Sequence, residues 1–359
     1  MVSVSGWPSK PATRLLLKRV VLAASLFLLL PTLIFAGWVA TYALRPGPET
    51  AAKSAVVNIA RGSSLQSITT ILAAKGIIYE DVRFLLLAKI SGVSGMLQAG
   101  EFRLDTGKKP LEVLKALVVA KAIQYAITIP EGLRASEIAA VFGEGGWFDP
   151  RSFTNLMVDK EFMAKHGLSG LDSLEGYLYP DTYLLTRDVR GAEKIMGLMI
   201  ARFNKVWAEI TAQREEKPDR QKTLILASMV EKETGAPAER PLIAGVFLNR
   251  LQLGMRLQSD PTVLYGLENH VGTITRSDLQ NPNAYNTYAV AGLPAGPICS
   301  PGKEALLAVL APTPTKDLYF VSKNDGTHHF SATLAEHNSA VQKYQRKKGG
   351  EKGKPSVQQ

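Results

Sequence analysis

The longest apolar run of the chain covers residues 20–44 and holds no charged side chain across 25 residues. A helix of about 20 apolar residues spans the hydrocarbon core of a bilayer, and such a helix tolerates an internal proline such as Pro31. Four basic residues precede the run and only Arg45 closely follows it, so the positive-inside rule keeps the N-terminus in the cytoplasm. The pattern predicts one uncleaved transmembrane helix. A cleaved signal peptide is the alternative, but the run is long for one and no A-x-A triplet follows it.

The pattern after a short linker at 45–54 predicts a small module over residues 55–125. It reads as strand, helix, strand and helix, with Ser63 or Ser64 able to cap the first helix and Gly76 ending it. Two short strands with two helices make a small α+β unit. This stretch resembles a LysM-like carbohydrate-binding module. A purely structural module is the alternative.

Residues 173–185 read SLEGYLYPDTYLL, and three tyrosines alternate there with Glu175 and Asp181. Aromatic rings beside carboxylates suit stacking on sugars and hydrogen bonding to their hydroxyl groups. The alternative is a bent strand packed in the core, with each tyrosine hydroxyl satisfied by a protein partner.

A strongly apolar helix is predicted to end in LILASMVEKET, residues 224–234, with Gly235 and Pro237 as stop signals. Projected at about 100° per residue, its apolar side chains at 225, 226, 229 and 230 have a mean direction of about 170°. Glu233 points in nearly the same direction. Glu231 points to the opposite face, where we expect it to be solvated.

The chemistry expected of Glu233 follows from this placement. Burial disfavours an ionised carboxylate and raises its pKa, and the negative end of the helix dipole adds to this effect. A carboxylic acid that is still protonated near neutral pH can act as a general acid at a glycosidic oxygen. The alternative is a structural glutamate paired with a core arginine such as Arg250.

Two further segments could complete a site with Glu233. A second amphipathic helix is predicted from Arg240 to about Leu253, and after it Asp260 precedes Pro261, the usual pattern of a helix N-cap. A polar contact of Asp260 to substrate is the other possibility. The long Gly/Pro-rich loop 281–302 offers a ring and an amide at Tyr285 and Asn286, and loops of this kind tend to line binding sites.

Composition narrows the possible partners. The formal net charge is +10, but nine of these charges lie in a basic tail at 1–19 and in residues 343–359. The nearly neutral body excludes a nucleic-acid channel, which needs a basic face on the fold itself. The single cysteine, Cys299, cannot form an internal disulfide, and no Cys/His spacing indicates a metal site. The three histidines at 328, 329 and 337 are interpreted as ordinary polar residues, and 346–359 as a disordered tail.

Four blocks carry a resemblance to a known family: LASMVEKET, ERPLIAGVFLNRLQLGMRLQSDPTVLYGL, AYNTYAVAGLPAGPICSPG and LYFVSKNDGTHHFSATLAEHN. Their order and spacing resemble the endolytic murein transglycosylases of the MltG (YceG-like) family. The resemblance covers about residues 55–345 and is most specific over 224–300. In that family the catalytic acid is the second glutamate of the E-K-E-T block, which corresponds to Glu233.

The resemblance implies an α+β protein: a transmembrane helix at 20–44, the LysM-like module at 55–125 and a mixed α/β catalytic domain at 126–345. It implies cleavage of the β-1,4 bond between N-acetylmuramic acid and N-acetylglucosamine within peptidoglycan strands, leaving 1,6-anhydro ends. One carboxyl group would act as acid and then base, without cofactor or metal. The sequence shows no second acid in an equally apolar context. The candidate sugar-binding residues are Asp260, Tyr285 and Asn286.

The same resemblance implies an outward-facing catalytic domain at the bacterial inner membrane, where the enzyme would terminate or trim new strands. Peptidoglycan synthases are then candidate partners. Two other functions stay open at this stage. One is a hydrolase of the same glycan that uses Asp260 to activate water; the other is an anchored binding or scaffold protein in which Glu233 is structural.

Overall fold

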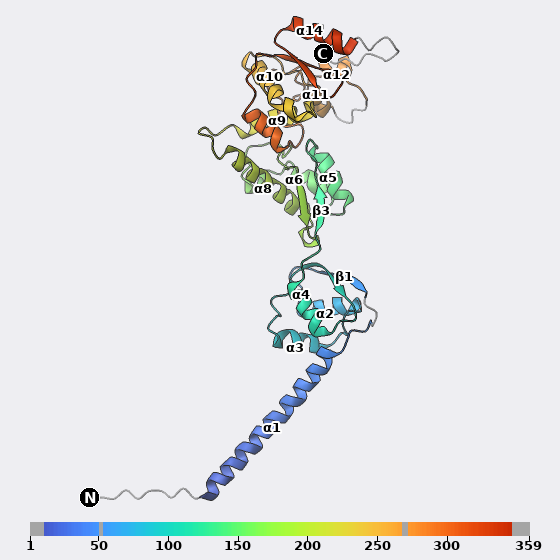
Figure 1. The fold of residues 1–359 in the computed structure, drawn as a ribbon, viewed down its shortest axis with the longest axis vertical. Helices are drawn as coiled ribbons and strands as arrows, with labels where there is room; N and C mark the ends of the chain where they lie inside the picture. Colours follow the sequence, from blue (N-terminus) through green and yellow to red (C-terminus); the bar gives the residue numbers. More distant parts are fainter. Residues whose placement is uncertain (1–10, 50–52, 268–271, 347–359) are drawn as a thin grey trace, which may run out of the picture. The chain divides into compact units, whose positions relative to one another are not determined.

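The computed structural model describes residues 11–49, 53–267 and 272–346, and shows a mixed α and β chain (Figure 1). The chain divides into two compact units, residues 1–124 with 186–188 and residues 125–185 with 189–359. Each unit has its own hydrophobic core. Most of the predicted basic N-terminal tail and nearly all of the predicted disordered C-terminal tail lie outside the described residues.

Helix α1, Pro11–Leu44, continues through Pro31 without a break. Its segment Lys18–Leu44 is, among the described residues, the one helix long and apolar enough to cross a membrane. Val39, Tyr42 and Ala43 near its end are buried in the core of the first unit. The helix therefore joins the first unit through a packed contact as well as through the chain.

The rest of the first unit contains one helix more than the sequence pattern predicted. Its elements are β1 Ser54–Ile59, α2 Leu65–Ala74, α3 Val82–Ile90, β2 Gly100–Asp105 and α4 Pro110–Val119. Strands β1 and β2 pair antiparallel, and Ser64 caps α2 by accepting a hydrogen bond from the Ser67 N–H. Helix α3 was missed because its apolar residues point both into the core and away from it, so no amphipathic period marks it.

The second unit is mainly helical, with two separate two-stranded antiparallel sheets, β3–β4 and β5–β6. Its elements in chain order are β3 Tyr125–Thr128, α5 Ala135–Glu144, α6 Pro150–Leu156, α7 Lys160–Lys165, β4 Thr182–Leu185, α8 Ala192–Thr211, α9 Arg220–Glu233, α10 Arg240–Gln252, α11 Asp260–Gly266, α12 Arg276–Gln280, α13 Lys303–Leu310, β5 Tyr319–Ser322, β6 His328–Ser331 and α14 Leu334–Val341. The β5–β6 hairpin turns through Asn324 and Gly326, both at positive φ, as the Asn-Asp-Gly sequence predicts.

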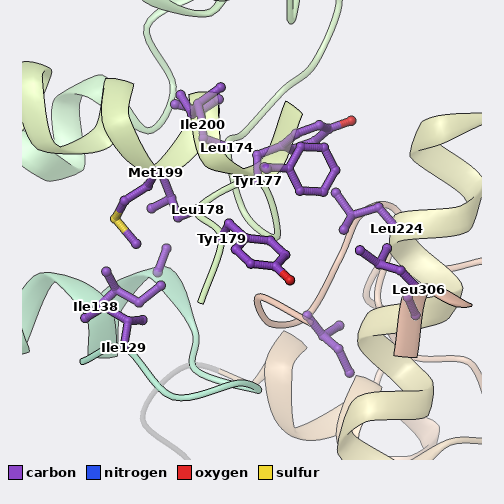
Figure 2. Close-up of a cluster of buried hydrophobic side chains, with 14 of the residues drawn as sticks. Ile129, Ile138, Leu174, Tyr177, Leu178, Tyr179, Met199, Ile200, Leu224 and Leu306 are labelled. Carbon is purple, nitrogen blue, oxygen red and sulfur yellow. The ribbon is translucent and has the colours of Figure 1, made fainter. Parts of the chain in front are cut away.

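Residues 174–180 of the tyrosine-rich segment 173–185 are buried in the core of the second unit. Figure 2 shows Tyr177 and Tyr179 among leucine, isoleucine and methionine side chains, and both rings are buried. The Tyr177 hydroxyl donates to Gln221 Oε1 at 2.7 Å, and the backbone carbonyl of Tyr179 accepts from the Tyr183 hydroxyl at 2.6 Å. The suggestion that these two rings stack on sugars is therefore wrong, because no sugar can reach them. The packed alternative holds for these two rings, and the hydroxyls of Tyr177 and Tyr183 have protein partners.

Helix α9 is the centre of the second unit and contacts α10, α11 and α13. Every side chain from Thr223 to Val230 is buried, including Ser228 on the face that was expected to meet solvent. A helix surrounded on all sides by protein has no solvent face. The direction of a side chain on this helix therefore does not by itself decide whether it is solvated.

Candidate active site

Glu233 is the last residue of α9, and the residue as a whole is partly exposed. Ser259 Oγ donates a hydrogen bond to Glu233 Oε1 at 2.5 Å. Burial raises the pKa of Glu233 to about 7, and the nearby carboxyl of Asp260 pushes it in the same direction. The Ser259 hydrogen bond and the charge of Arg250 act against this rise. The structure thus gives Glu233 the protonation behaviour of a general acid near neutral pH.

Ser259 is held rigidly at the start of α11, where it is the N-cap residue. Its N–H donates to Thr287 Oγ1 at 2.9 Å, and its carbonyl accepts from Thr262 Oγ1 at 2.6 Å. Its hydroxyl does not cap the helix and bonds Glu233 instead. Sequence reasoning missed this residue, although a serine directly before Asp-Pro is a recognisable capping signal.

Asp260 is the first residue of α11 and not its N-cap, so the capping prediction is wrong by one position. Its Oδ1 accepts a hydrogen bond from the Tyr288 hydroxyl at 2.7 Å. Burial raises the pKa of Asp260, and the Tyr288 hydrogen bond partly offsets this. Asp260 and Tyr288 are both partly exposed. The charge of Asp260 raises the pKa of Glu233, and the charge of Glu233 raises the pKa of Tyr288, so the three groups lie together.

Glu231 is not solvated, contrary to the prediction. Its side chain is only 7% exposed, and its Oε1 lies 3.1 Å from Arg240 Nη2. Its Oε2 accepts from the Gly302 N–H at 3.0 Å. The helical projection placed this side chain on the correct face, but α13 and its preceding loop cover that face. Glu231 therefore joins α9 to α10 and to the start of α13.

Arg250 does not hold Glu233 in an ion pair within the described part of the chain. Its guanidinium donates to the backbone carbonyl of Leu318 at 2.6 Å and to that of Leu257 at 2.9 Å. Of the groups that shift the pKa of Glu233, Arg250 has the smallest effect. The alternative interpretation, a glutamate neutralised by Arg250, is therefore not supported.

The structure separates the two candidates of loop 281–302. Asn286 is 0% exposed, and its Nδ2 donates to the carbonyls of Asn281 and Leu279 at 2.7 and 3.1 Å. The amide thus fixes the loop from inside, and Asn286 presents no exposed surface in this structure. Tyr285 is half-buried, and the centre of its ring lies 4.7 Å from that of Tyr265. Part of its ring remains accessible.

Comparison with known proteins identifies the family of this chain. The model of the YceG-like family matches residues 57–343. The chain belongs to the YceG-like family. It is 33% identical over 316 residues to a Bacillus subtilis protein named endolytic murein transglycosylase, covering 84% of this chain and 88% of that protein.

Two further likenesses agree with this assignment. A Streptococcus pneumoniae protein of the same name is 28% identical over 330 residues, covering 83% of this chain and 60% of that longer protein. The crystal structure of a putative yceG-like protein from Listeria monocytogenes has a TM-score of 0.53 and 33% identity, and the match covers 81% of this chain and all of that one.

This YceG-like chain also contains a further buried acid, Glu175, contrary to the expectation that no second acid has an equally apolar setting. Glu175 is 5% exposed and accepts hydrogen bonds from the Ala135 N–H and from the Tyr265 hydroxyl, each at 3.0 Å. Burial raises its pKa to about 7 as well. Tyr265 lies near the end of α11, whereas Ser259 precedes its start. Glu175 therefore supports the helix that carries Ser259.

Two of the three histidines at 328, 329 and 337 have ordinary structural partners in this YceG-like chain. His328 Nδ1 lies 2.7 Å from Glu239 Oε2, and the His337 ring stacks on Tyr319 with centroids 5.2 Å apart. Within the described ranges, no group of three or more His, Cys, Asp or Glu side chains could hold a metal ion. Cys299 is buried and unpaired.

Proposed function

We propose that this protein is an endolytic lytic transglycosylase that cleaves the β-1,4 bond between N-acetylmuramic acid and N-acetylglucosamine inside peptidoglycan strands. Membership of the YceG-like family and the name shared by its relatives assign it to the lytic transglycosylases, which are lyases that act on peptidoglycan. The bond cleaved, the catalytic glutamate and the cellular role are parts of the proposal.

The observation that carries the proposal is the setting of Glu233. Glu233 is a partly exposed residue whose carboxyl group has a pKa raised to about 7 by burial, and Ser259 binds only its Oε1. In the proposal Oε2 carries the proton toward the substrate. A hydrogen bond to one oxygen fixes the orientation of the carboxyl group, which lowers the entropic cost of reaching the reactive geometry.

The proposed reaction uses one carboxyl group twice. Protonated Glu233 donates its proton to the glycosidic oxygen, and the bond from that oxygen to C1 of the muramyl sugar breaks. The 6-hydroxyl oxygen of the same sugar bonds to C1, and the hydroxyl proton passes to the Glu233 carboxylate. The products are a free sugar hydroxyl, a 1,6-anhydro end and the protonated enzyme, so no water is consumed. The substrate's acetamido group stabilises positive charge at C1, in place of the second carboxylate of ordinary glycosidases.

Asp260 and Tyr285 are the proposed sugar-binding groups. Asp260 lies beside Glu233 and is partly exposed, so its free oxygen can accept from a sugar hydroxyl while Tyr288 holds the other. The accessible part of the Tyr285 ring can stack on a sugar face. Asn286 is left out because it is buried.

The membrane location and the division into domains are also proposed, and the membrane location rests on the apolar helix α1. The segment Lys18–Leu44 would anchor the protein in the bacterial inner membrane with its N-terminus in the cytoplasm. Residues 55–125 would be the LysM-like module, and 126–345 the outward-facing catalytic domain. In this position the enzyme would terminate or trim nascent strands beside peptidoglycan synthases.

The test is mass spectrometry of peptidoglycan digested by the wild type and by Glu233→Gln, which keeps size and removes the acid. Glu304→Gln, an exposed position on α13, is the matched control. We expect 1,6-anhydro products from the wild type and the control and none from Glu233→Gln at unchanged thermal stability. Anhydro products from Glu233→Gln would refute its assignment. Reducing ends from the wild type would favour a hydrolase, and strand binding without cleavage would favour a scaffold.

A further inference from the structure

Helix α3 presents apolar side chains on two opposite faces. Phe84, Leu87 and Ala88 are buried in the core of the first unit. Val82 and Ile90 are 57% and 64% exposed on the outward face, with the half-buried Leu86 between them. These three outward residues are spaced four apart, so they form one line along the helix. An outward line of valine, leucine and isoleucine is costly in water and indicates an apolar neighbour.

The position of α3 indicates what this neighbour is. The helix packs against α1 in the same unit, and Arg83 makes the contact. Its guanidinium lies 5.3 Å from the Trp38 ring and 5.1 Å from the Tyr42 ring, and its Nη1 donates to the Trp38 carbonyl at 3.3 Å. Asp81 pairs with the same guanidinium at 2.6 Å. Trp38 and Tyr42 belong to the last two turns of α1, where a spanning helix leaves the hydrocarbon core.

A second set of contacts joins the end of α1 to the segment just before α3. The Tyr42 hydroxyl donates to the carbonyl of Tyr79 at 2.8 Å, and the Arg45 guanidinium lies 4.5 Å from the centre of the Tyr79 ring. Tryptophan, tyrosine and arginine are the residues that favour the membrane–water boundary, because each has an apolar body and a polar end. The contact region between α1 and α3 therefore has the composition of a membrane interface.

We propose that α3 lies on the outer surface of the bilayer, with Val82, Leu86 and Ile90 inserted among the lipid headgroups and upper acyl chains. The inference rests on the proposed membrane anchor. The occupant is lipid because the contacts of Arg83 tie α3 to the end of the spanning helix, so the bilayer is the apolar phase within reach of the exposed line. Lys89, exposed beside Ile90, can extend its ammonium group to a phosphate. The first unit is then held against the membrane surface.

Lipid quenching of a site-specific fluorophore tests this in the full chain in proteoliposomes. Cys299 is the only cysteine and is buried, so Cys299→Ala gives a background for single labels. A nitrobenzoxadiazole label is attached at Ile90→Cys and, separately, at Val82→Cys. Val56→Cys on β1 is the matched control, because Val56 is also an exposed apolar residue of this unit. Leu29→Cys reports on the spanning helix. The quencher is a lipid with a nitroxide near the top of its acyl chain.

We expect quenching at Ile90 and Val82 at least about twofold stronger than at Val56, together with quenching at Leu29. Quenching at Leu29 with equal, weak quenching at the other three positions would overturn the proposal and leave the anchor intact. Absence of quenching at Leu29 would overturn the anchor and this inference with it. Equal strong quenching at Val56 would also overturn the proposal, because the contact would not be specific to α3.

Discussion

Ser259 Oγ lies 2.5 Å from Glu233 Oε1 and donates to it, joining the start of α11 to the last residue of α9. These two residues are 26 positions apart in the chain. The bond stabilises the carboxylate form, so it lowers the pKa of Glu233 against the stronger effect of burial. Ser259 therefore influences both the orientation and the proton affinity of the proposed catalytic group.

Replacement of Ser259 by alanine should slow cleavage while leaving some activity. The lost hydrogen bond to a charged group corresponds to about a tenfold fall in kcat. The pKa of Glu233 should also rise, because a partner of its ionised form is removed. Rates of anhydro-product formation measured across pH should show the loss of activity at high pH moved to higher values. Ser259→Thr keeps a hydroxyl and should retain the wild-type profile. Equal effects of both substitutions would contradict the hydrogen-bond role.

The wild-type enzyme should be more active below neutral pH than above it. The first step needs protonated Glu233, whose pKa is about 7, so the rate should fall as the pH rises through about 7. The fall is to be followed with the same product assay, with circular dichroism at each pH as the control for folding. A midpoint close to the usual glutamate range would show that Glu233 is not shifted as its burial requires.

The local elements of this site could be predicted from the sequence. The expected helix from Arg240 to about Leu253 is α10, and Gly254 beyond it has a positive φ, as a glycine after a helix usually does. The end of α9 before Gly235 was also predicted. These features depend on neighbours within a few residues, which the sequence displays directly.

The features that could not be predicted depend on distant contacts. Glu175 meets Tyr265, 90 residues away, so nothing near it in the sequence shows that it is a buried acid. Glu231 was expected in solvent because a helical projection gives direction only, and Gly302, 71 residues away, covers it. A projection could not by itself single out Glu233, since residues 223–230 of α9 are buried on every face.

Glu175 should make the folded protein less stable as the pH rises. Its folded pKa is about 7, above the ordinary value of 4.5, so the native state binds the extra proton between these values. The contribution of Glu175 to stability is then greatest below about pH 4.5, falls as the pH rises to about 7, and changes little above. In Glu175→Gln this dependence of Tm on pH should become shallower, while Glu304→Gln should keep it. Thermal unfolding followed by circular dichroism measures the slopes, and an unchanged slope in Glu175→Gln would mean that Glu175 does not carry it.

Glu231 provides the sharpest contrast with Glu233, because the two acids are two residues apart on one helix. Glu231→Gln should destabilise the protein by about 1–3 kcal/mol, since Arg240 loses a charged hydrogen-bond partner in a site with little water. The glutamine oxygen can still accept from the Gly302 N–H, so the fold should persist. At a temperature well below Tm, the folded variant should form anhydro products with the wild-type pH profile, whereas Glu233→Gln should keep its Tm and form none. The pair of variants thus separates chemistry from stability, and loss of activity in folded Glu231→Gln would place the catalytic role on both acids.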